Sequence, residues 1–278
     1  MRFFTTLLLT LPLAVVTVPP EFEPSQTGSS TRPLAQVPAV PRPTDLRVLV
    51  PAYFYPVPGS PWVRLTAASA AYPGRVAAIG NPASGPGTSV DPTYTAAFQT
   101  FRASAGTLIG YVSTRYAARP IAEVKADLDT WLLFYPVDGF FLDEMSNVPG
   151  QDEAYHLELN QFIAARLPGA LVVGNPGTST SPSYLFLNTE RVVCTLCIYE
   201  DSTDFLTWTA DPWVDRFAGQ NFYALPHSIQ PTRWQAIVDH AYSQNCGWIY
   251  TTDDTLPNPW DTLPAFFESF VGYVDGTY

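Results

Sequence analysis

The sequence predicts an α/β protein that folds as one closed (β/α)8 barrel, the TIM-barrel architecture. From residue 45 onward, short apolar runs alternate with longer segments of helical periodicity, and eight apolar runs can be counted. The chain has 278 residues, 46% of them hydrophobic, which suits a single barrel domain of about 250 residues. Parallel strands need crossover helices, and a closed sheet leaves no exposed edge, so the barrel is favoured over the alternative, a doubly wound open sheet.

The eight expected strands are short, mostly apolar and separated by loops rich in Pro and Gly. In chain order they are 47–53, 76–81, 108–113, 139–143, 170–174, 191–199, 221–226 and 246–251. Because the strand-helix unit repeats, we expect a helix after each strand. The clearest helical segments are 121–134, 154–166, 233–244 and 263–274.

Apolar periodicity and boundary residues support these helices. In the first, apolar residues recur at three- and four-residue steps and form one stripe that would cover a sheet: Ile121, Val124, Leu128, Trp131 and Leu132. Pro120 begins this helix, Pro168 and Gly169 stop the next one, and Asp261 with Thr262 is expected to cap the last.

The N-terminal region has the composition of a targeting segment followed by a linker. Residues 1–18 resemble a secretory signal peptide, with one early positive charge and a short apolar core that is interrupted by Pro12. This core is shorter than the roughly 20 residues of a membrane span, although no clean Ala-x-Ala cleavage site follows and an uncleaved anchor is the alternative. Residues 19–44 are rich in Pro, Ser and Thr and are expected to form a disordered tether. We therefore expect the (β/α)8 domain to cover 45–278 in a secreted or cell-wall-associated monomer, with no stable membrane span after signal removal.

Charge composition argues against nucleic acid as a partner. Charged residues make up 14% of the chain, the net charge is −11, and Lys125 is the only lysine. Binding along a phosphate backbone therefore lacks its electrostatic driving force. A neutral or cationic partner is more compatible with this composition.

No pattern in the sequence predicts a metal or cofactor. The three cysteines allow at most one disulfide, and the Cys-x-x-Cys pair lies in a strand pattern, where buried thiols are expected rather than ligands. These cysteines are Cys194, Cys197 and Cys246. The histidines are scattered, and they are His156, His227 and His240. No Gly-x-Gly-x-x-Gly or Gly-Lys-Ser/Thr motif follows a strand, so nucleotide cofactors have no support.

Two expected strands end on acidic residues. The strand 139–143 delivers Asp143 and Glu144 to its C-terminal end, and Glu200 directly follows the strand 191–199. Barrel enzymes assemble their active sites at this face, so the three carboxyl groups are expected to share one mouth. The alternative is a structural role, in which strand-end acids bond to backbone N–H groups or pair with arginine.

Aromatic and amide residues are expected at the same rim and suit a sugar, whose ring has apolar faces and a hydroxyl edge. The candidate substrate-binding residues are Tyr53, Tyr55, Asn81, Tyr111, Asn175, Tyr199, His227 and Asp253. Glycoside cleavage needs one carboxyl that protonates the leaving oxygen and another that attacks the anomeric carbon or activates water. Because strand side chains alternate, Asp143 and Glu144 can aim at one atom only if the strand ends between them.

The chain resembles the spherulin-4-like proteins, a family classed among the glycoside hydrolases, over about residues 48–274. Six ordered motifs support the resemblance: 50–56 (Val-Pro-Ala-Tyr-Phe-Tyr-Pro), 79–87 (Ile-Gly-Asn-Pro-Ala-Ser-Gly-Pro-Gly), 110–114 (Gly-Tyr-Val-Ser-Thr), 138–144 (Asp-Gly-Phe-Phe-Leu-Asp-Glu), 174–177 (Gly-Asn-Pro-Gly) and 199–200 (Tyr-Glu). The resemblance implies a (β/α)8 barrel that cleaves polysaccharide containing α-linked N-acetylgalactosamine internally, as in the galactosaminogalactan of fungal walls and biofilms.

The resemblance also implies roles for the three acids. Asp143 is expected as nucleophile and Glu200 as general acid/base, with Glu144 positioning substrate or tuning a pKa, and an exchange of Asp143 and Glu144 is the alternative. Retention of configuration would place the two catalytic carboxyls about 5 to 5.5 Å apart, and inversion about 6.5 to 9.5 Å apart. The other hypotheses are a non-catalytic polysaccharide-binding or spore-wall protein on the same barrel, and a glycosidase that acts on another galactoside or amino sugar.

Overall fold

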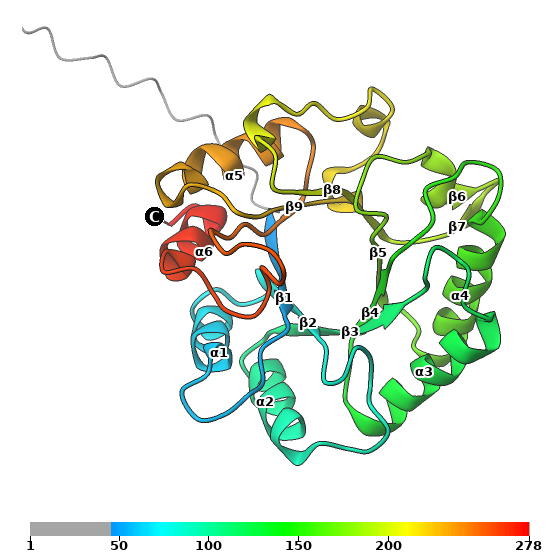
Figure 1. Cartoon of the computed structure of the whole chain (residues 1–278), viewed down its shortest axis with the longest axis horizontal. Coiled ribbons are helices and arrows are strands. Elements are labelled where there is room, and N and C mark those ends of the chain that lie inside the picture. The colour runs from blue at the N-terminus through cyan, green and yellow to red at the C-terminus, as the bar shows by residue number, and fades with distance from the viewer. Residues whose placement is uncertain (1–45, 278) are drawn as a thin grey trace, which may run out of the picture. The chain divides into compact units, whose positions relative to one another are not determined.

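The computed structural model describes residues 46–277, and within them eight parallel strands close into a barrel (Figure 1). Around the barrel the strand order is β1, β10, β9, β8, β5, β4, β3, β2. Their bounds are β1 Arg47–Ala52, β2 Val76–Gly80, β3 Thr107–Ser113, β4 Gly139–Asp143, β5 Leu171–Gly174, β8 Thr195–Asp201, β9 Phe222–Pro226 and β10 Trp248–Ile249. The predicted barrel is therefore confirmed, and the open sheet is excluded because β1 pairs with both β2 and β10.

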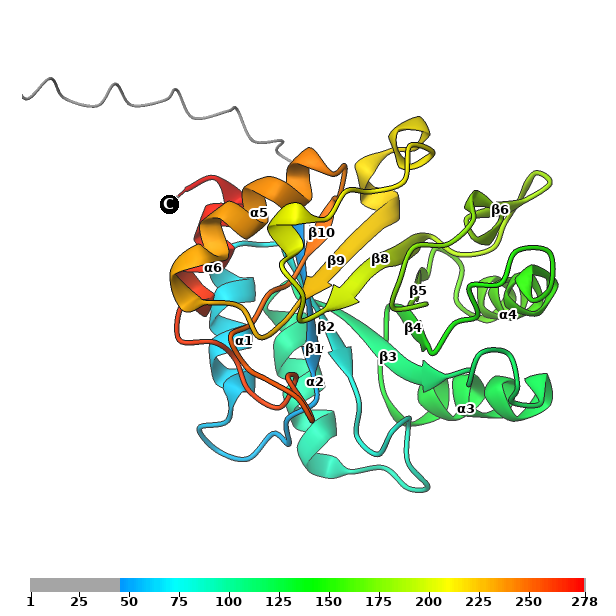
Figure 2. The same ribbon diagram turned by 45° about the horizontal axis from the view of Figure 1, so that its top comes forward.

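Six α-helices of the described chain surround this barrel (Figures 1 and 2). They are α1 Pro61–Ala71, α2 Pro92–Ala103, α3 Ile121–Phe134, α4 Glu153–Arg166, α5 Trp234–Ser243 and α6 Phe267–Asp275. Within the predicted stripe of α3, the side chains of Val124, Leu128 and Trp131 are fully buried against the barrel. The start and the stop predicted for α3 and α4 agree with the structure, since α3 begins after Pro120 and α4 ends before Pro168.

A helix does not follow every strand, so this part of the sequence prediction was wrong. Between β5 and β8 the chain forms the 3-10 turn η1 Pro182–Tyr184 and an antiparallel hairpin, β6 Phe186–Leu187 with β7 Glu190–Arg191, which lies beside α4 (Figure 2). Between β8 and β9 there are only 3-10 turns, η2 Phe205–Thr207, η3 Val214–Arg216 and η4 Gly219–Asn221. Here stacked aromatic rings, such as Phe205 on Trp208 and Phe186 on Phe217, provide apolar cover in place of a helix.

Predicted boundaries also differ at three elements, one of which is the expected strand 246–251, shortened to β10 Trp248–Ile249. The predicted strand 191–199 is β8, which starts at Thr195 and runs to Asp201, because Arg191 belongs to the hairpin. The last helix starts at Phe267 rather than 263, and its N-terminus has no side-chain cap, so the predicted cap at Asp261 and Thr262 was wrong. The guanidinium of Arg64 in α1 donates to the backbone oxygens of Leu263 and Pro264, at 3.3 and 3.0 Å, which holds these residues outside the helix.

Close packing between α3 and β3 positions a residue of the barrel mouth. A Cβ atom added to Gly110 would lie 2.7 Å from the ring of Trp131, so glycine is needed for this approach. Nε1 of Trp131 donates a hydrogen bond of 2.9 Å to the backbone oxygen of Tyr111. The indole therefore fixes the strand backbone at Tyr111, whose side chain belongs to the candidate site described below.

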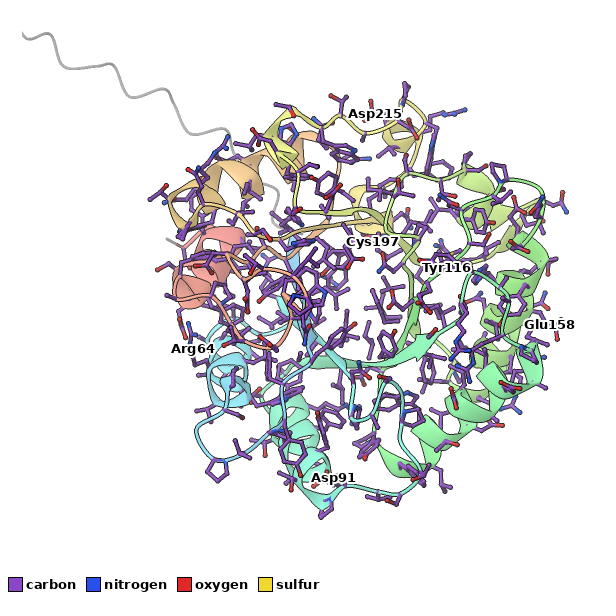
Figure 3. All side chains as sticks on the ribbon, viewed as in Figure 1. Arg64, Asp91, Tyr116, Glu158, Cys197 and Asp215 are labelled. Atoms are coloured by element: carbon purple, nitrogen blue, oxygen red, sulfur yellow. The ribbon has the colours of Figure 1, made fainter. Side chains whose placement is uncertain are left out.

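Charged side chains lie mainly around the outside of the barrel. Figure 3 shows Arg64, Asp91, Glu158 and Asp215 at the periphery, whereas Cys197 lies in the barrel wall. In the part of the chain that the structure describes, none of the helices combines the length and the apolar character that crossing a membrane requires. The predicted signal peptide, 1–18, and the predicted linker, 19–44, lie outside the described residues.

Candidate active site

One asparagine amide joins two carboxyl groups at the C-terminal end of the barrel. Nδ2 of Asn175, directly after β5, donates hydrogen bonds to Oδ1 of Asp143 at 2.8 Å and to Oε2 of Glu200 at 2.6 Å. The backbone N–H of Gly177 donates to Oδ1 of the same amide at 3.0 Å, so the amide nitrogen must face the acids. Oδ1 of Asp143 and Oε2 of Glu200 are both hydrogen-bonded to Nδ2 of Asn175. The distance between these two oxygens therefore cannot exceed the sum of the two hydrogen-bond lengths, about 5.4 Å.

Glu200 reaches this mouth through a β-bulge in β8. In the pairing of β8 with β9, Cys197 lies opposite Tyr223 and Tyr199 lies opposite Ala224, so β8 contains one extra residue. In a regular strand, residues three apart would face opposite sides of the sheet. The bulge allows Glu200 to face the same interior as the buried thiol of Cys197, and the two groups interact there.

Asp143 ends strand β4 and lies half-buried beside two tyrosines. The side chain of Tyr111 forms a hydrogen bond with this carboxyl, and the ring of Tyr53 meets the ring of Tyr111 edge-on, with centroids 5.6 Å apart. Burial raises the pKa of Asp143 above its usual value, while the hydrogen bonds from Tyr111 and Asn175 act in the opposite direction. The site thus desolvates this carboxyl but supplies three donors that stabilise its charged form, the third being the backbone N–H of Glu144.

Glu200 is adapted to hold a proton near neutral pH. Burial raises the pKa of Glu200 from 4.5 to about 7. The hydrogen bond from Asn175 lowers the pKa and the negative charge of Asp143 raises it. A carboxyl of this kind can donate a proton at pH 7, which an ordinary glutamate, with a pKa of about 4.3, cannot do efficiently.

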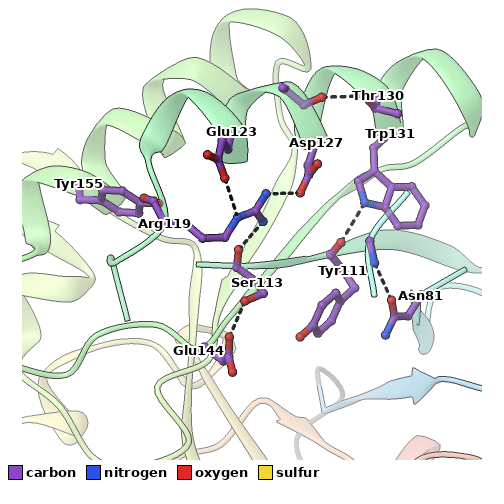
Figure 4. Close-up of polar contacts among 12 residues, drawn as sticks. Asn81, Tyr111, Ser113, Arg119, Glu123, Asp127, Thr130, Trp131, Glu144 and Tyr155 are labelled. Carbon is purple, nitrogen blue, oxygen red and sulfur yellow. Dashed lines mark hydrogen bonds and ion pairs between the residues drawn. The ribbon is translucent and has the colours of Figure 1, made fainter. Parts of the chain in front are cut away.

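Glu144 points to a different side of the mouth because the strand ends before it. Its backbone has φ 50°, a left-handed conformation that is uncommon for residues other than glycine and that breaks the alternation of the strand. Oγ of Ser113, at the end of β3, donates to Oε2 of Glu144 (Figure 4). Oγ1 of Thr114 donates to the backbone oxygens of Asp143 and Glu144, at 3.1 and 2.8 Å, and holds this turn. The carboxyl of Glu144 is thus bonded to Ser113 at the end of β3, whereas that of Asp143 is bonded to Asn175 after β5 and to Tyr111 within β3.

Of the predicted substrate-binding residues, three lie at the acid pair and one lies at the nearby rim. Asn175 and Tyr111 bond to the acids directly, and the burial-raised pKa of the Tyr53 hydroxyl also reflects the charges of Asp143 and Glu200. Asn81 follows β2, and its Oδ1 accepts a hydrogen bond of 2.9 Å from the backbone N–H of Gly85, which closes the loop (Figure 4). The structure therefore brings Tyr53, Tyr111 and Asn175 together with Asp143 and Glu200.

The contacts of Tyr55 and Tyr199 are made away from the acid pair. The half-exposed Tyr55 donates to Oδ2 of Asp91 at 3.0 Å, at the N-terminus of α2. The ring of Tyr199 packs on Phe205, with centroids 4.6 Å apart, and its hydroxyl bonds to Thr203. These are contacts of packing and loop closure.

His227 and Asp253 follow β9 and β10. His227 is buried, with Nδ1 3.0 Å from Oγ of Ser228 and its ring edge-on to Trp260. Burial lowers the pKa of this imidazole. Asp253 lies partly exposed after β10. Among the described hydrogen bonds, none joins either side chain to Asp143, Glu144 or Glu200.

Sequence reasoning did not assign roles to three residues that support the acids. Ser113 and Thr114 lay inside the quoted motif 110–114, so a signal for them existed, whereas nothing marked Arg119. Nη1 of Arg119 donates to the backbone oxygen of Ser113 at 2.8 Å, and Nη2 donates to Asp127 at 2.7 Å. These contacts hold the β3 side of the mouth in place.

No metal centre is formed by the described side chains, because residues 46–277 contain no group of three or more His, Cys, Asp or Glu side chains placed to hold an ion. All three cysteines are free thiols, with Cys197 and Cys246 buried and Cys194 half-buried. The arrangement that the described residues offer for chemistry is a pair of carboxyl groups, one with a raised pKa, joined by the amide of Asn175.

Fold and site together define a (β/α)8 barrel protein with a pair of carboxyl groups at the C-terminal mouth. Residues 47–274 match Spherulation-specific family 4, and the chain belongs to this family. Over 220 residues the chain is 31% identical to Spherulin-4 of Physarum polycephalum. The matched region covers 75% of this chain and 63% of that protein, so the chain spans less than two thirds of that relative. The crystal structure of Aspergillus clavatus Sph3 in complex with GalNAc has a TM-score of 0.73 and 24% identity, covers 83% of this chain and 98% of that one, and has the same fold.

Proposed function

We propose that this protein is a glycoside hydrolase that cleaves polysaccharide containing α-linked N-acetylgalactosamine at internal bonds, with retention of configuration. The observation that supports the proposal most directly is the shared amide of Asn175, which keeps the oxygens of Asp143 and Glu200 within about 5.4 Å. Retaining enzymes need about 5 to 5.5 Å between their carboxyls, and inverting enzymes need more room for a water molecule. Membership of the spherulin family and the GalNAc complex of Sph3 favour an amino-sugar substrate.

In the first step, the ionised carboxylate of Asp143 attacks the anomeric carbon. Glu200 gives its proton to the glycosidic oxygen as the bond to the leaving chain breaks. The product is a covalent sugar ester on Asp143 and a free chain end. In the second step, Glu200 takes a proton from water, the water oxygen attacks the anomeric carbon, and Asp143 leaves as a carboxylate.

The electrostatics of the site agree with this division of roles. A pKa of about 7 keeps much of Glu200 protonated at neutral pH, as a general acid requires. Asp143 accepts hydrogen bonds from Tyr111 and Asn175 that favour its charged form, as a nucleophile requires. A non-catalytic binding protein has no need for a protonated carboxyl beside an ionisable one, so these features favour an enzyme.

The proposal is tested by a mass-spectrometric product assay on purified galactosaminogalactan and on competing polysaccharides. We expect the wild type to release oligosaccharides from the first polymer, and Asp143→Asn and Glu200→Gln to release none. Asp215→Asn is the matched control, because it makes the same carboxyl-to-amide change at an exposed peripheral residue and should keep full activity. Full activity of Glu200→Gln would remove it from the mechanism, and monosaccharide as the sole product would indicate cleavage from chain ends. NMR of the first product tests retention, since the α-anomer must appear before mutarotation.

We also propose that the protein acts outside the cell as a monomer, because a wall or biofilm polysaccharide is an extracellular substrate. Secretion is tested by expressing the full chain in a native or fungal host and sequencing the N-terminus of the protein recovered from the medium. A mature N-terminus near residue 18 is expected. Retention of the whole chain in the membrane fraction would indicate an uncleaved anchor.

A further inference from the structure

A polar cavity lies beside the candidate active site, on its β3 side. Its volume is about 450 Å³, within the range of about 300 to 1,000 Å³ that is usual for ligand sites. Tyr111, Ser113 and Glu144 line the side next to the acid pair, and Arg119, Glu123 and Asp127 line the other side (Figure 4). Tyr111 is common to both places, because it also bonds to Asp143.

Glu144 contributes a carboxyl group to the near wall of this cavity. Its only described side-chain hydrogen bond comes from Oγ of Ser113, and none of the ion pairs within residues 46–277 involves it. An ionised carboxyl has about four acceptor positions, so several remain for donors from a ligand. The left-handed backbone at Glu144 directs this side chain to a different set of neighbours from those of Asp143.

A chain of hydrogen bonds holds Ser113, and through it Glu144, from the far wall. Arg119 donates to the backbone oxygen of Ser113 and is itself anchored by Asp127 at 2.7 Å. The hydroxyl of Tyr155 in α4 donates to the backbone oxygen of Arg119 at 3.0 Å. Two donors of the Arg119 guanidinium hold Ser113 and Asp127, and Asp127 and Glu123 form ion pairs with it, so Arg119 serves to position the wall.

We propose that this cavity is a second sugar-binding subsite, which takes the unit of the polysaccharide next to the bond that Asp143 and Glu200 cleave. Glu144 accepts hydrogen bonds from donor groups of that sugar, Tyr111 borders both subsites, and Ser113 with Arg119 are positioning residues. This inference rests on the proposed function and gives Glu144 a role in substrate binding rather than in the covalent step. The ligand class is a sugar unit that offers hydroxyl or amino donors, since a carboxylate can only accept.

Binding is measured without turnover by placing each variant in the Glu200→Gln background. The probes are α-1,4-linked N-acetylgalactosamine oligosaccharides of increasing length, titrated by calorimetry. Longer oligosaccharides should bind more tightly than short ones because they also fill the second subsite. Adding Glu144→Gln or Ser113→Ala should lower this extra affinity by about 10-fold or more, the effect of losing a hydrogen bond to a charged group. Ser113→Thr keeps the hydroxyl and should restore most of the affinity, and Asp215→Asn is the control at the periphery.

The outcomes separate this inference from the proposed function. If Glu200→Gln binds the oligosaccharides and the added Glu144→Gln leaves every affinity unchanged, the subsite is wrong and the glycosidase proposal stands. If Glu200→Gln binds no oligosaccharide and the wild type cleaves none, both proposals are wrong. Circular dichroism and thermal unfolding of each variant identify a fold defect. If a variant is misfolded, the milder Arg119→Lys variant tests the subsite instead, and it should weaken the binding of long oligosaccharides more than that of short ones.

Discussion

Asp143 and Glu200 each accept a hydrogen bond from the same nitrogen atom, Nδ2 of Asn175, although they lie in strands far apart in the sequence. An amide nitrogen has two hydrogens, so it can serve one carboxyl with each. The orientation of the amide is set by Gly177, not by the acids themselves. One side chain, whose own geometry is fixed by the following turn, therefore links the two acids in position and, together with burial, sets their proton affinities.

The first prediction concerns the pH dependence of hydrolysis. Glu200 must be protonated to act as an acid, and its pKa is about 7. We therefore expect kcat/KM to fall about tenfold per pH unit above this value, and to fall on the acid side as Asp143 takes up a proton above its usual pKa. Rates measured from about pH 4 to about pH 9 test this. A profile that stays flat into the alkaline range would argue against Glu200 as the acid.

The second prediction concerns stability. Because burial raises the folded-state pKa of Glu200 above 4.5, the folded protein binds more protons than the unfolded chain between these values, and stability falls as pH rises from about 4.5 through about 7. Gln does not ionise, so Glu200→Gln should be more stable than wild type at pH 8, by about 1 to 3 kcal/mol, and nearly equal at pH 4. Urea unfolding at both pH values measures this difference. Asp215→Asn should not show it, and an equal effect at both pH values would contradict the linkage.

Removal of the shared amide is the third prediction. The hydrogen bonds from Asn175 lower the pKa of both Asp143 and Glu200, so Asn175→Ala should move both limbs of the pH profile to higher pH. We also expect kcat to fall by about 10²-fold, as for other lost donors in active sites. The matched control is Asn81→Ala, which removes an asparagine that bonds within its own loop and should leave both limbs in place. If both limbs of the pH profile of Asn175→Ala stay at their wild-type pH, the amide does not lower the pKa of the two acids.

The fourth prediction tests the turn between the strand and Glu144. Thr114 is fully buried, and Thr114→Val removes the hydroxyl that bonds to the backbone oxygens of Asp143 and Glu144 while keeping the volume. The free energy of unfolding should fall by about 1 to 2 kcal/mol, and kcat should fall with it. Thr114→Ser should recover most of both. Thr100→Val, at an exposed position of α2, should change neither; an equal effect there would mean that the loss at Thr114 is not specific.

Alkylation of the thiols is the fifth prediction. Burial raises the pKa of Cys197 and of Cys246, so few thiolates form there at neutral pH and the reagent has poor access. In the native protein, iodoacetamide should therefore label the half-buried Cys194 and spare the other two, and in urea it should label all three. Peptide mass spectrometry identifies the labelled sites. Fast labelling of Cys197 in the native protein would show that the barrel wall opens.

Local patterns were sufficient for the regular part of the barrel. The first four strands and α3 lie within one or two residues of their predicted bounds, because apolar runs, helical periodicity and Pro or Gly boundaries are all properties of adjacent residues. The connections around β8 were not predictable in this way. There the cover is made by rings such as Phe205 and Trp208, which become neighbours only after folding.

The start of α6 shows the same limit. Asp261 and Thr262 form a plausible cap in the sequence, but Arg64 binds the carbonyl groups of Leu263 and Pro264 from another helix and delays the start. A contact between residues so far apart in the chain leaves no local signal. Likewise, the role of Arg119 behind Ser113 depends on the packing of α3 against β3.

The sequence by itself determined the order of the eight barrel strands and the presence of Asp143, Glu144 and Glu200 at or near strand ends, because these follow from periodicity and composition along the chain. Only the tertiary structure decided which acids form a pair. The bulge in β8 turns Glu200 inward, and the left-handed residue after β4 separates Glu144 from Asp143. In each case the backbone conformation at one residue changes the direction of a side chain. Which groups that side chain then meets depends on how the barrel closes.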